Sequence, residues 1–396
     1  MQHDAKISQN EDPMTEAIDR FLGAALRAAI HASPLPTWPP HWPCAADVAD
    51  AVFKRIAFHG IMLFLLNDPA KLEGWPASLR TAMGQEARAQ TFWELGHRQV
   101  LTRLVVALGD ARAGCVITKG TALAYSVYPD PATRRRGDSD LLLRDVRRKD
   151  VRRTLAANGF HPVGDKRPLQ ESWSQTCPMG FDHVFDLHWR INASPLLAYH
   201  LESAGVGSHK APLPRLSDRA WAIAPADNLV LVAINRAAHG TFGYTSGDDK
   251  LFDRERLIWA VDFDLICRSL APGDWDDLIA VVRASGTAPL VRSALAYAQR
   301  VLGTPIPDAV SRELETMPGK REVMRYFEAL SGLDRLRLDF AASRTWGEKL
   351  HVARYTFFPG TEVLHERFAD ATHWPLPILQ VRRLAGGLGR VLTGRP

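Results

Sequence analysis

Cysteine is scarce in this sequence, and several common catalytic signatures are missing. The 396 residues include four cysteines that lie far apart and show no C-x-x-C spacing, so neither a zinc site nor a disulfide framework is expected. No segment has the form G-x-x-x-x-G-K-[ST], H-E-x-x-H or G-x-S-x-G. The carboxyl-terminal "GGLGR" follows no predicted strand, so it is not a dinucleotide-binding fingerprint.

Long apolar runs and a strong net charge are missing as well. The longest apolar run, "IMLFLL", is too short to span a bilayer. The amino-terminal "MQHDAKISQNEDP" is polar and carries acids, unlike a signal peptide. With 49 basic and 44 acidic residues the net charge is +5, which does not by itself indicate a nucleic-acid partner. We therefore expect a cytoplasmic protein that does not insert into membranes.

The basic excess is concentrated in one segment. Between Arg134 and Arg153 there are nine Arg or Lys residues and four Asp. Such a cluster is most often a solvated helix face, but beside an active site it can hold phosphates. The segment contains no aromatic residue to stack on bases, which argues against a module that binds single-stranded nucleic acid.

Helical and strand-like patterns divide the chain into blocks and predict an α+β fold. Apolar residues every three to four positions predict helices before and after the middle of the chain, where short β-branched runs alternate with helical ones. The expected divisions are an amino-terminal helix and Pro/Trp-rich linker (1–44), a helical region (45–112), an α/β core with a mixed sheet (113–195), a second helical region (196–340) and a carboxyl-terminal extension (341–396).

Two aspartates begin the predicted strand "DSDLLL". Because side chains two residues apart on a strand share a face, Asp138 and Asp140 point one way and Ser139 the other. Two neighbouring carboxylates repel unless a cation neutralises them, and hard oxygen ligands suit Mg²⁺ or Mn²⁺. Replacing either aspartate by asparagine is accordingly expected to abolish activity and to stabilise the metal-free protein slightly.

A small-residue turn precedes this strand. Gly120 and Thr121 follow "CVIT" at a predicted helix start, where backbone N–H groups can cradle a triphosphate. Lys119 and Arg134 would offset the charge of the phosphates. The alternatives are an ordinary strand-to-helix turn and, for Arg134–Arg136, an exposed loop.

A third carboxylate is expected on the strand "HVFDLHW". Alternation places Asp186 and His188 on the face of Asp138 and Asp140, with Phe185 turned to the core. Three carboxylates and a metal fit an in-line displacement at phosphorus. The competing interpretations are that D-x-D caps a turn and that His188 is a hydrogen-bonded structural histidine.

These residues carry a family resemblance. "ITKGTALAYSVYPDPATRRRGDSDLLL" resembles the core of bacterial nucleotidyltransferase-like proteins of the DNA polymerase β superfamily. It is similar in particular to a poorly characterised branch with a later D-L-H-W segment, which reads "FDLHWRI" here. The helical segments "ADNLVLVAINRAAHG" and "RLIWAVDFDLI" also resemble that branch. The likeness extends from about Ala45 to about Ser269 and implies a small polymerase β-like α/β core with helical flanks.

The resemblance also implies roles for single residues. Gly120 and Thr121 stand where the superfamily's turn holds the nucleotide phosphates, Asp138 and Asp140 stand at its two metal-binding acids, and Asp186 stands at its third acid. The turn is Gly-Thr rather than Gly-Ser, and a longer spacer of sixteen residues separates it from the D-x-D pair. The spacer leaves open where the neighbouring basic side chains lie relative to the phosphates.

The activity so implied is transfer of a nucleoside monophosphate from an NTP to an acceptor hydroxyl or phosphate, with release of pyrophosphate. The acceptor stays open among RNA, a protein, a peptide and a small metabolite. Two alternatives are a phosphotransferase that uses the same metal site and a catalytically silent protein that binds a nucleotide or a partner.

Two helices that follow the core are expected to pack together beside it. They are "DNLVLVAINRAAHG" and "RERLIWAVDFDLI", whose apolar positions recur at helical spacing. His239 and Asp262 lie within them, and no metal-ligand spacing links the two. Each is therefore expected to cap a helix or to bond locally.

Overall fold

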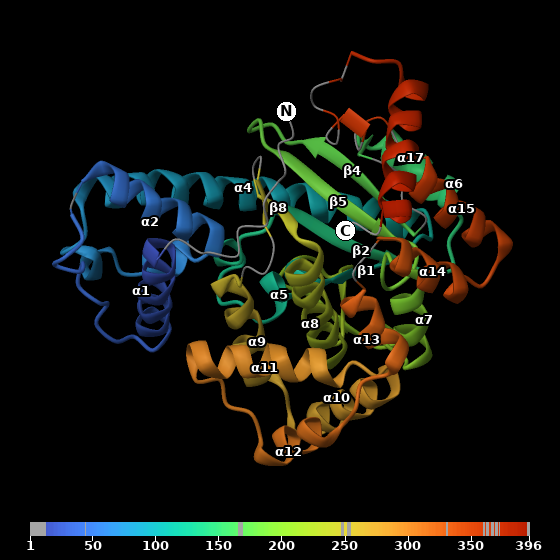
Figure 1. The fold of residues 1–396 in the computed structure, drawn as a ribbon. Coiled ribbons are helices and arrows are strands. Elements are labelled where there is room, and N and C mark those ends of the chain that lie inside the picture. The colour runs from blue at the N-terminus through green and yellow to red at the C-terminus, as the bar shows by residue number, and fades with distance from the viewer. Residues whose placement is uncertain are drawn as a thin grey trace.

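A mixed seven-stranded sheet lies at the centre of the computed structural model (Figure 1). The structure describes residues 13–393, except 44, 165–168, 247–248, 252–254, 330–331 and short stretches between 359 and 372. The strand order is β3-β4-β5-β2-β1-β7-β6, with β2 parallel to β5 and antiparallel to β1. The strands are β1 (Cys115–Thr118), β2 (Asp138–Leu143), β3 (His161–Val163), β4 (Gln170–Thr176), β5 (Asp182–His188), β6 (Lys210–Pro212) and β7 (Trp221–Ile223).

The predicted mixed α/β core is confirmed, and the sheet is larger than expected. The segments expected to be extended form β1, β2, β3 and β5. β4 was not predicted, and neither were β6 and β7, which come from residues 210–223 in the part expected to be helical. β7 joins the core sheet by running parallel to β1. Three-residue strands such as β6 and β7 are too short to show a period of two in the sequence.

Alternation along β2 and β5 separates an apolar face from a polar one. Leu141, Leu143, Phe185 and Leu187 pack into a buried cluster with residues of α4 (Ala77–Asp110) and α6 (Arg148–Ala157). This is the core side expected for Phe185. The opposite face carries the three aspartates, and we call it the acidic face. The remaining helices of this part of the chain are α5 (Lys119–Ser126), the 3-10 helix η2 (Pro131–Thr133) and α7 (Pro195–Ser203).

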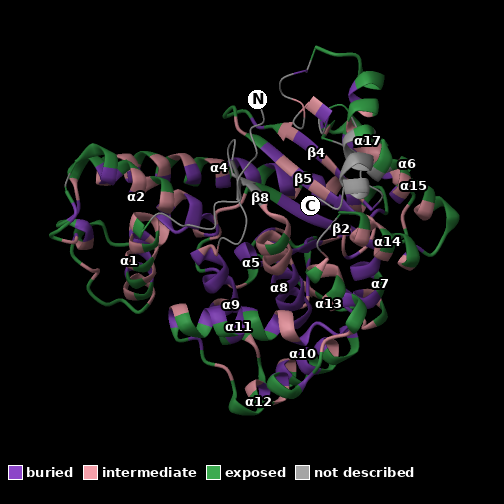
Figure 2. Ribbon diagram, in the orientation of Figure 1, coloured by how far each residue is buried: buried purple, intermediate pink, exposed green. Residues whose placement is uncertain are grey.

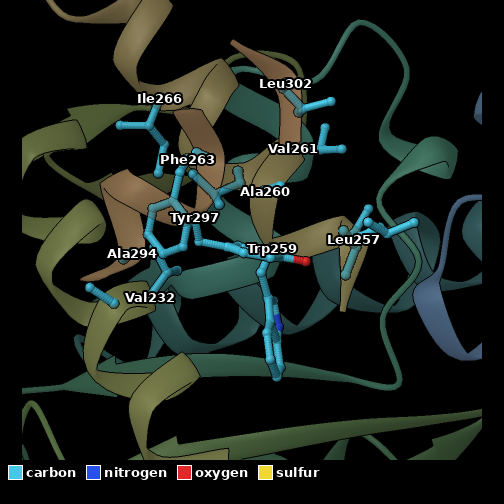
Figure 3. Close-up of a cluster of buried hydrophobic side chains, with 14 of the residues drawn as sticks. Val232, Leu257, Trp259, Ala260, Val261, Phe263, Ile266, Ala294, Tyr297 and Leu302 are labelled. Atoms are coloured by element: carbon cyan, nitrogen blue, oxygen red, sulfur yellow. The ribbon is translucent and has the colours of Figure 1, made fainter. Parts of the chain in front are cut away.

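A helical layer follows the sheet in the sequence and packs beside it (Figure 1). The helices α8 (Pro225–Phe242) and α9 (Leu257–Ser269) pack against each other, as predicted, and α11 (Ala288–Leu302) contacts both. Figure 3 shows their buried side chains, among them Val232, Val261 and Phe263. The helices that complete the layer are α10 (Pro272–Ser285), α11 (Ala288–Leu302) and α12 (Asp308–Thr316). A small hairpin, β8 (Tyr244–Ser246) and β9 (Asp249–Leu251), connects α8 to α9.

The amino-terminal region packs its Pro/Trp-rich segment into an aromatic cluster. Trp38 and Trp42 are buried and lie edge-on to Phe21 of α1 (Pro13–Ile30), with ring centroids 6.2 and 5.2 Å from that of Phe21. Trp75 lies 5.0 Å from the same ring. The segment therefore acts as a strap that is fixed to the helices. These helices are α1 (Pro13–Ile30), α2 (Ala46–His59), α3 (Met62–Leu65) and η1 (Pro69–Leu72).

Few of the described residues in the carboxyl-terminal helices are buried (Figure 2). These helices are α13 (Arg321–Glu328), α14 (Gly332–Ala342), α15 (Trp346–Phe357) and α17 (Leu376–Thr393). α14 contains no buried residue, but its Asp339 accepts hydrogen bonds from Ser194 Oγ and the Leu196 N–H at the start of α7. Within the described residues, no helix combines the length and apolarity needed to cross a bilayer.

Candidate metal and nucleotide site

The pairing of β2 with β5 brings the predicted carboxylates together. Asp140 lies directly opposite Asp186 in this parallel pair, and Asp138 precedes Asp140 by two residues on the same face. Potential ligand atoms of Asp140, Asp186 and His188 all lie within 4.8 Å of one another. The expectation that Asp186 shares a face with Asp138 and Asp140 is therefore confirmed.

Asp140 is the electrostatic centre of the group. Its Oδ1 accepts a hydrogen bond of 2.6 Å from Lys119 Nζ and one of 2.8 Å from His188 Nε2. Because a carboxylate can only accept, the His188 proton must be on Nε2. Burial acts to raise the pKa of Asp140, but Lys119 and His188 outweigh it and hold the pKa below its usual range.

Asp138 differs from Asp140 although both belong to the same D-x-D pair. Its side chain keeps contact with solvent. Desolvation by the surrounding protein, together with the charges of Asp140 and Asp186, raises its pKa to about 7, against the opposing effects of Lys119 and Arg134. Removing a charge is therefore still expected to stabilise the metal-free protein at Asp138, whereas at Asp140 the bonds from Lys119 and His188 favour the charged form and argue against such stabilisation.

Asp186 is held by the neighbouring strand β4. Its Oδ1 accepts from Ser172 Oγ and its Oδ2 from Gln170 Nε2, both at 2.6 Å. These two donors fix the orientation of the carboxylate without supplying a full positive charge. Each oxygen of Asp186 still has lone pairs for a cation or a proton.

The expected phosphate turn begins α5 and is tightly constrained. Lys119 has a φ of +53°, in the left-handed region. A Cβ built on Gly120 would lie 3.1 Å from Nη2 of Arg134, so glycine leaves room for that guanidinium. The Thr121 hydroxyl is turned to the buried side, where it shares a 2.7 Å hydrogen bond with Ser139 Oγ. What the turn offers to a ligand is thus backbone N–H groups rather than a hydroxyl.

A buried hydrogen-bond network supports β2 on the side opposite the acidic face. Ser139, which points away from the acidic face, also shares a 2.7 Å hydrogen bond with His97 Nε2 of α4. Burial, aided by the charges of Arg136 and His183, lowers the pKa of His97 well below its usual value, so the imidazole is neutral. The chain Thr121–Ser139–His97 therefore fixes the start of α5 and the D-x-D strand against α4.

The arginine run that precedes β2 is largely buried, so the exposed-loop alternative is wrong. Arg134 donates from Nε and Nη2 to the two oxygens of Asp262 at 2.6 and 2.8 Å, and Tyr128 donates to Asp262 Oδ1 at 2.6 Å. The Arg136 side chain pairs with Glu94 at 2.8 Å. The expectation that Asp262 bonds locally is also wrong, because its partners Arg134 and Tyr128 lie far away in the sequence. Arg134 approaches the turn, but its charge is already matched.

His239 lies on the α8 side of the site. Its ring stacks on Trp259 of α9, with centroids 5.9 Å apart. Burial lowers the pKa of His239 to about 4, and the charges of Lys119 and Arg256 add to the effect while Asp140 opposes it. The helix α8 borders the start of α5, because Asn228 of α8 bonds to the Lys119 backbone and the two helices contact each other.

The donor set suits a divalent cation. Asp140, Asp186 and His188 offer two carboxylates and an imidazole, and Asp138 adds a carboxyl nearby. Carboxylate oxygens are typical ligands of Mg²⁺ and Mn²⁺, and a single imidazole is compatible with Mn²⁺. The residues present therefore fit such an ion.

Several side chains that build the site were not singled out in the sequence. Gln170 and Ser172 belong to "QESWSQT", in which Glu171 and Trp173 are buried and alternate with the half-buried Gln170 and Ser172. Asn228 of α8, whose amide bonds to the backbone of Lys119, gave no signal in the sequence because 109 residues separate the two.

Comparison with known proteins agrees with this geometry. A family described as "Uncharacterised nucleotidyltransferase" matches residues 46–303, well over half of the chain and including all the strands of the sheet. Searches of curated proteins and of solved structures give no significant match. The match reaches from α2 to the end of α11 and so takes in the acidic face, the turn and the bordering helices. The chain belongs to this family of uncharacterised nucleotidyltransferases.

Proposed function

We propose that the protein is a metal-dependent enzyme that transfers a nucleoside monophosphate from an NTP to an acceptor hydroxyl or phosphate. The observation that carries the proposal is the register of β2 and β5, which sets Asp186 opposite Asp140 on the face that also bears Asp138. Three carboxylates placed so close together repel one another, which is unfavourable unless a cation neutralises them. A divalent cation bound there would neutralise phosphate oxygens of the donor and polarise phosphorus.

The start of α5 would bind the triphosphate. Its backbone N–H groups at Gly120 and Thr121 lie at the positive end of a helix, next to the Lys119 ammonium. Burial acts to lower the pKa of Lys119, but Asp140, Asp138 and Asp186 together raise it, so Lys119 stays charged. Arg134 would support the turn by packing against Gly120. Its charge is already paired with Asp262, so it would not serve to neutralise the phosphates.

Asp186 would receive the proton of the acceptor. The acceptor oxygen forms a bond to the α-phosphorus of the NTP, the bond from that phosphorus to the bridging oxygen breaks, and pyrophosphate leaves. Ser172 and Gln170 hold the Asp186 carboxylate in one orientation, which is what a positioned general base requires. The substrates would thus be an NTP and an acceptor among RNA, a protein, a peptide and a small molecule, and the reaction would take place in the cytoplasm with Mg²⁺ or Mn²⁺.

Radiolabelled nucleotides test the reaction type. The protein is incubated with each NTP labelled at the α or the γ phosphate, with Mg²⁺ or Mn²⁺ and with cell RNA, proteins or metabolites as acceptors. We expect label from the α position on an acceptor and labelled pyrophosphate from the γ position. Transfer of the γ label alone would identify a phosphotransferase instead, and nucleotide binding without either transfer would favour the silent alternative. Asp186→Asn serves as the matched control of strongly reduced activity.

A further inference from the structure

One side chain of the helical layer holds the backbone of the turn from both sides. Asn228, in the first turn of α8, is 2% exposed. Its Oδ1 accepts from the Lys119 N–H at 2.7 Å, and its Nδ2 donates to the Lys119 carbonyl oxygen at 3.3 Å. If the Asn228 amide were flipped, its Nδ2–H would face the Lys119 N–H and its Oδ1 would face the Lys119 carbonyl oxygen. The two hydrogen bonds together therefore define the orientation of the Asn228 amide.

The residue held in this way has a backbone conformation that L-amino acids disfavour. Lys119 has a φ of +53°, in the left-handed region. Unlike asparagine or aspartate, a lysine has no short polar side chain that stabilises this backbone conformation by a local hydrogen bond. Such conformations persist only where surrounding contacts determine them. The two bonds from Asn228 are contacts of this kind, because they satisfy both polar groups of the Lys119 backbone.

The side chain of the same residue reaches the centre of the acidic face. Lys119 Nζ lies 2.6 Å from Asp140 Oδ1, and the side chain is 20% exposed. The ammonium therefore stands beside the oxygen that a divalent cation would need. The conformation of one residue links the helical layer at its backbone to the candidate metal ligand at its side chain.

We propose that Asn228 is a positioning residue, which holds Lys119 in the left-handed conformation that directs its ammonium group to Asp140. The inference rests on the proposed function, since it takes a divalent cation and a polyphosphate as the ligands of the site. The ammonium competes with a divalent cation for Asp140 Oδ1 and attracts a polyphosphate. Loss of Asn228 should therefore change the two affinities in opposite directions, which loss of structure would not do.

Two binding measurements on the full chain test this. Mn²⁺ affinity is measured by electron paramagnetic resonance, and inorganic tripolyphosphate affinity at saturating Mn²⁺ by calorimetry, which makes the result independent of the nucleotide base. For Asn228→Ala we expect Mn²⁺ to bind about threefold to tenfold more tightly and tripolyphosphate to bind weaker by a similar factor, as for one weakened charge interaction. Asn228→Ser is measured as well and decides the matter if the alanine variant does not fold.

Matched variants separate positioning from folding. Asp227→Asn is the control, because Asp227 neighbours Asn228, is equally buried and accepts from the Gly207 N–H rather than from Lys119. It should leave both affinities unchanged. In a Lys119→Met background, Asn228→Ala should no longer affect either affinity. Equal losses of both affinities, no change in either, or effects that persist without Lys119 would overturn the inference. If the unmodified protein binds no Mn²⁺, the proposed function fails first and the inference with it.

Discussion

Two charged clusters lie close together in this protein and differ in their balance of charge. In the first, Arg134 and Asp262 pair through two hydrogen bonds, and Tyr128 completes the set without adding charge. In the second, on the acidic face, three carboxylates lie beside the ammonium of Lys119 and a histidine, both of which bond to Asp140. The first cluster is complete as it stands, whereas the second has an excess of negative charge.

The difference separates a structural role from a functional one. A buried pair with matched charges fixes the relation between α9 and the segment before β2 and needs no ligand. A group with unmatched charge is unfavourable by itself and persists in a fold when it binds a cation or a substrate. Both clusters contain aspartates beside basic side chains. The balance of charge, and not the type of residue, therefore distinguishes them.

The largest expected effect is on turnover at the unbalanced cluster. Asp140→Asn should lower activity at least about 10³-fold, because it removes the carboxylate on which Lys119 and His188 converge. Steady-state rates of label transfer from α-labelled NTP measure this. Asp182→Asn is the control, since Asp182 is an exposed residue at the other end of β5. Equal rates for Asp140→Asn and the unmodified enzyme would show that the acidic face has a structural role.

A somewhat smaller loss is expected at Asp186. Asp186→Asn should reduce the chemical step by about 10²–10⁴-fold, the range for a positioned general base, while NTP binding largely survives. Single-turnover rates and nucleotide affinity, measured separately, test the two parts of this statement. Loss of binding with an unchanged rate for bound substrate would instead make Asp186 a binding residue.

The balanced cluster should respond in stability rather than in chemistry. Asp262→Asn leaves the Arg134 guanidinium buried and unmatched, and should lower the free energy of unfolding by about 3–5 kcal/mol. Asp264→Asn is the matched control on the same helix, because Asp264 is equally buried but its Arg268 partner is 43% exposed. The asparagine can still accept from Thr304 Oγ1, so this substitution should cost about 1 kcal/mol. Urea denaturation measures both. Equal losses for the two variants would remove the distinction between the clusters.

The smallest effect concerns the pH dependence of stability at Asp138. Its folded-state pKa of about 7 lies above the ordinary value of 3.8, so the native state binds more protons than the unfolded state between these values. Stability should therefore fall as pH rises through this window. Asp138→Asn removes the penalty, and the metal-free variant should be more stable than the original by about 1 kcal/mol near pH 8, since solvent screens much of the repulsion. Melting curves across pH test this, and a difference that instead grows toward about pH 4 would contradict it.

Much of the acidic face could be predicted because it follows from local rules. Asp138 and Asp140 had to share a face of any strand formed by "DSDLLL", and Asp186 and His188 had to share a face of "HVFDLHW". On the second of these strands, the apolar residues Phe185 and Leu187, which alternate with Asp186, determined which face points to the core. The family resemblance supplied the order of these segments, and the match over residues 46–303 agrees with it.

The partners of single charges could not be predicted in this way. Arg134 and Asp262 are 128 residues apart, and neither position carries a pattern that names the other. The same holds for Asn228 and Lys119, which meet only because α8 packs beside the start of α5. An exposed loop stayed open as an alternative for the arginine run because sequence composition shows charge but not the carboxylates that neutralise it.

By itself, the sequence determined the strands that carry the acids, the faces on which those acids lie and the two helices that pack together. These features depend on the backbone period and on apolar spacing, which act between residues close in the chain. The tertiary structure decided which charges are matched, which strand supports Asp186, and how Lys119 comes to point at Asp140. Those outcomes depend on distance through space, because a charge is stabilised by whichever groups surround it and not by its neighbours in the sequence.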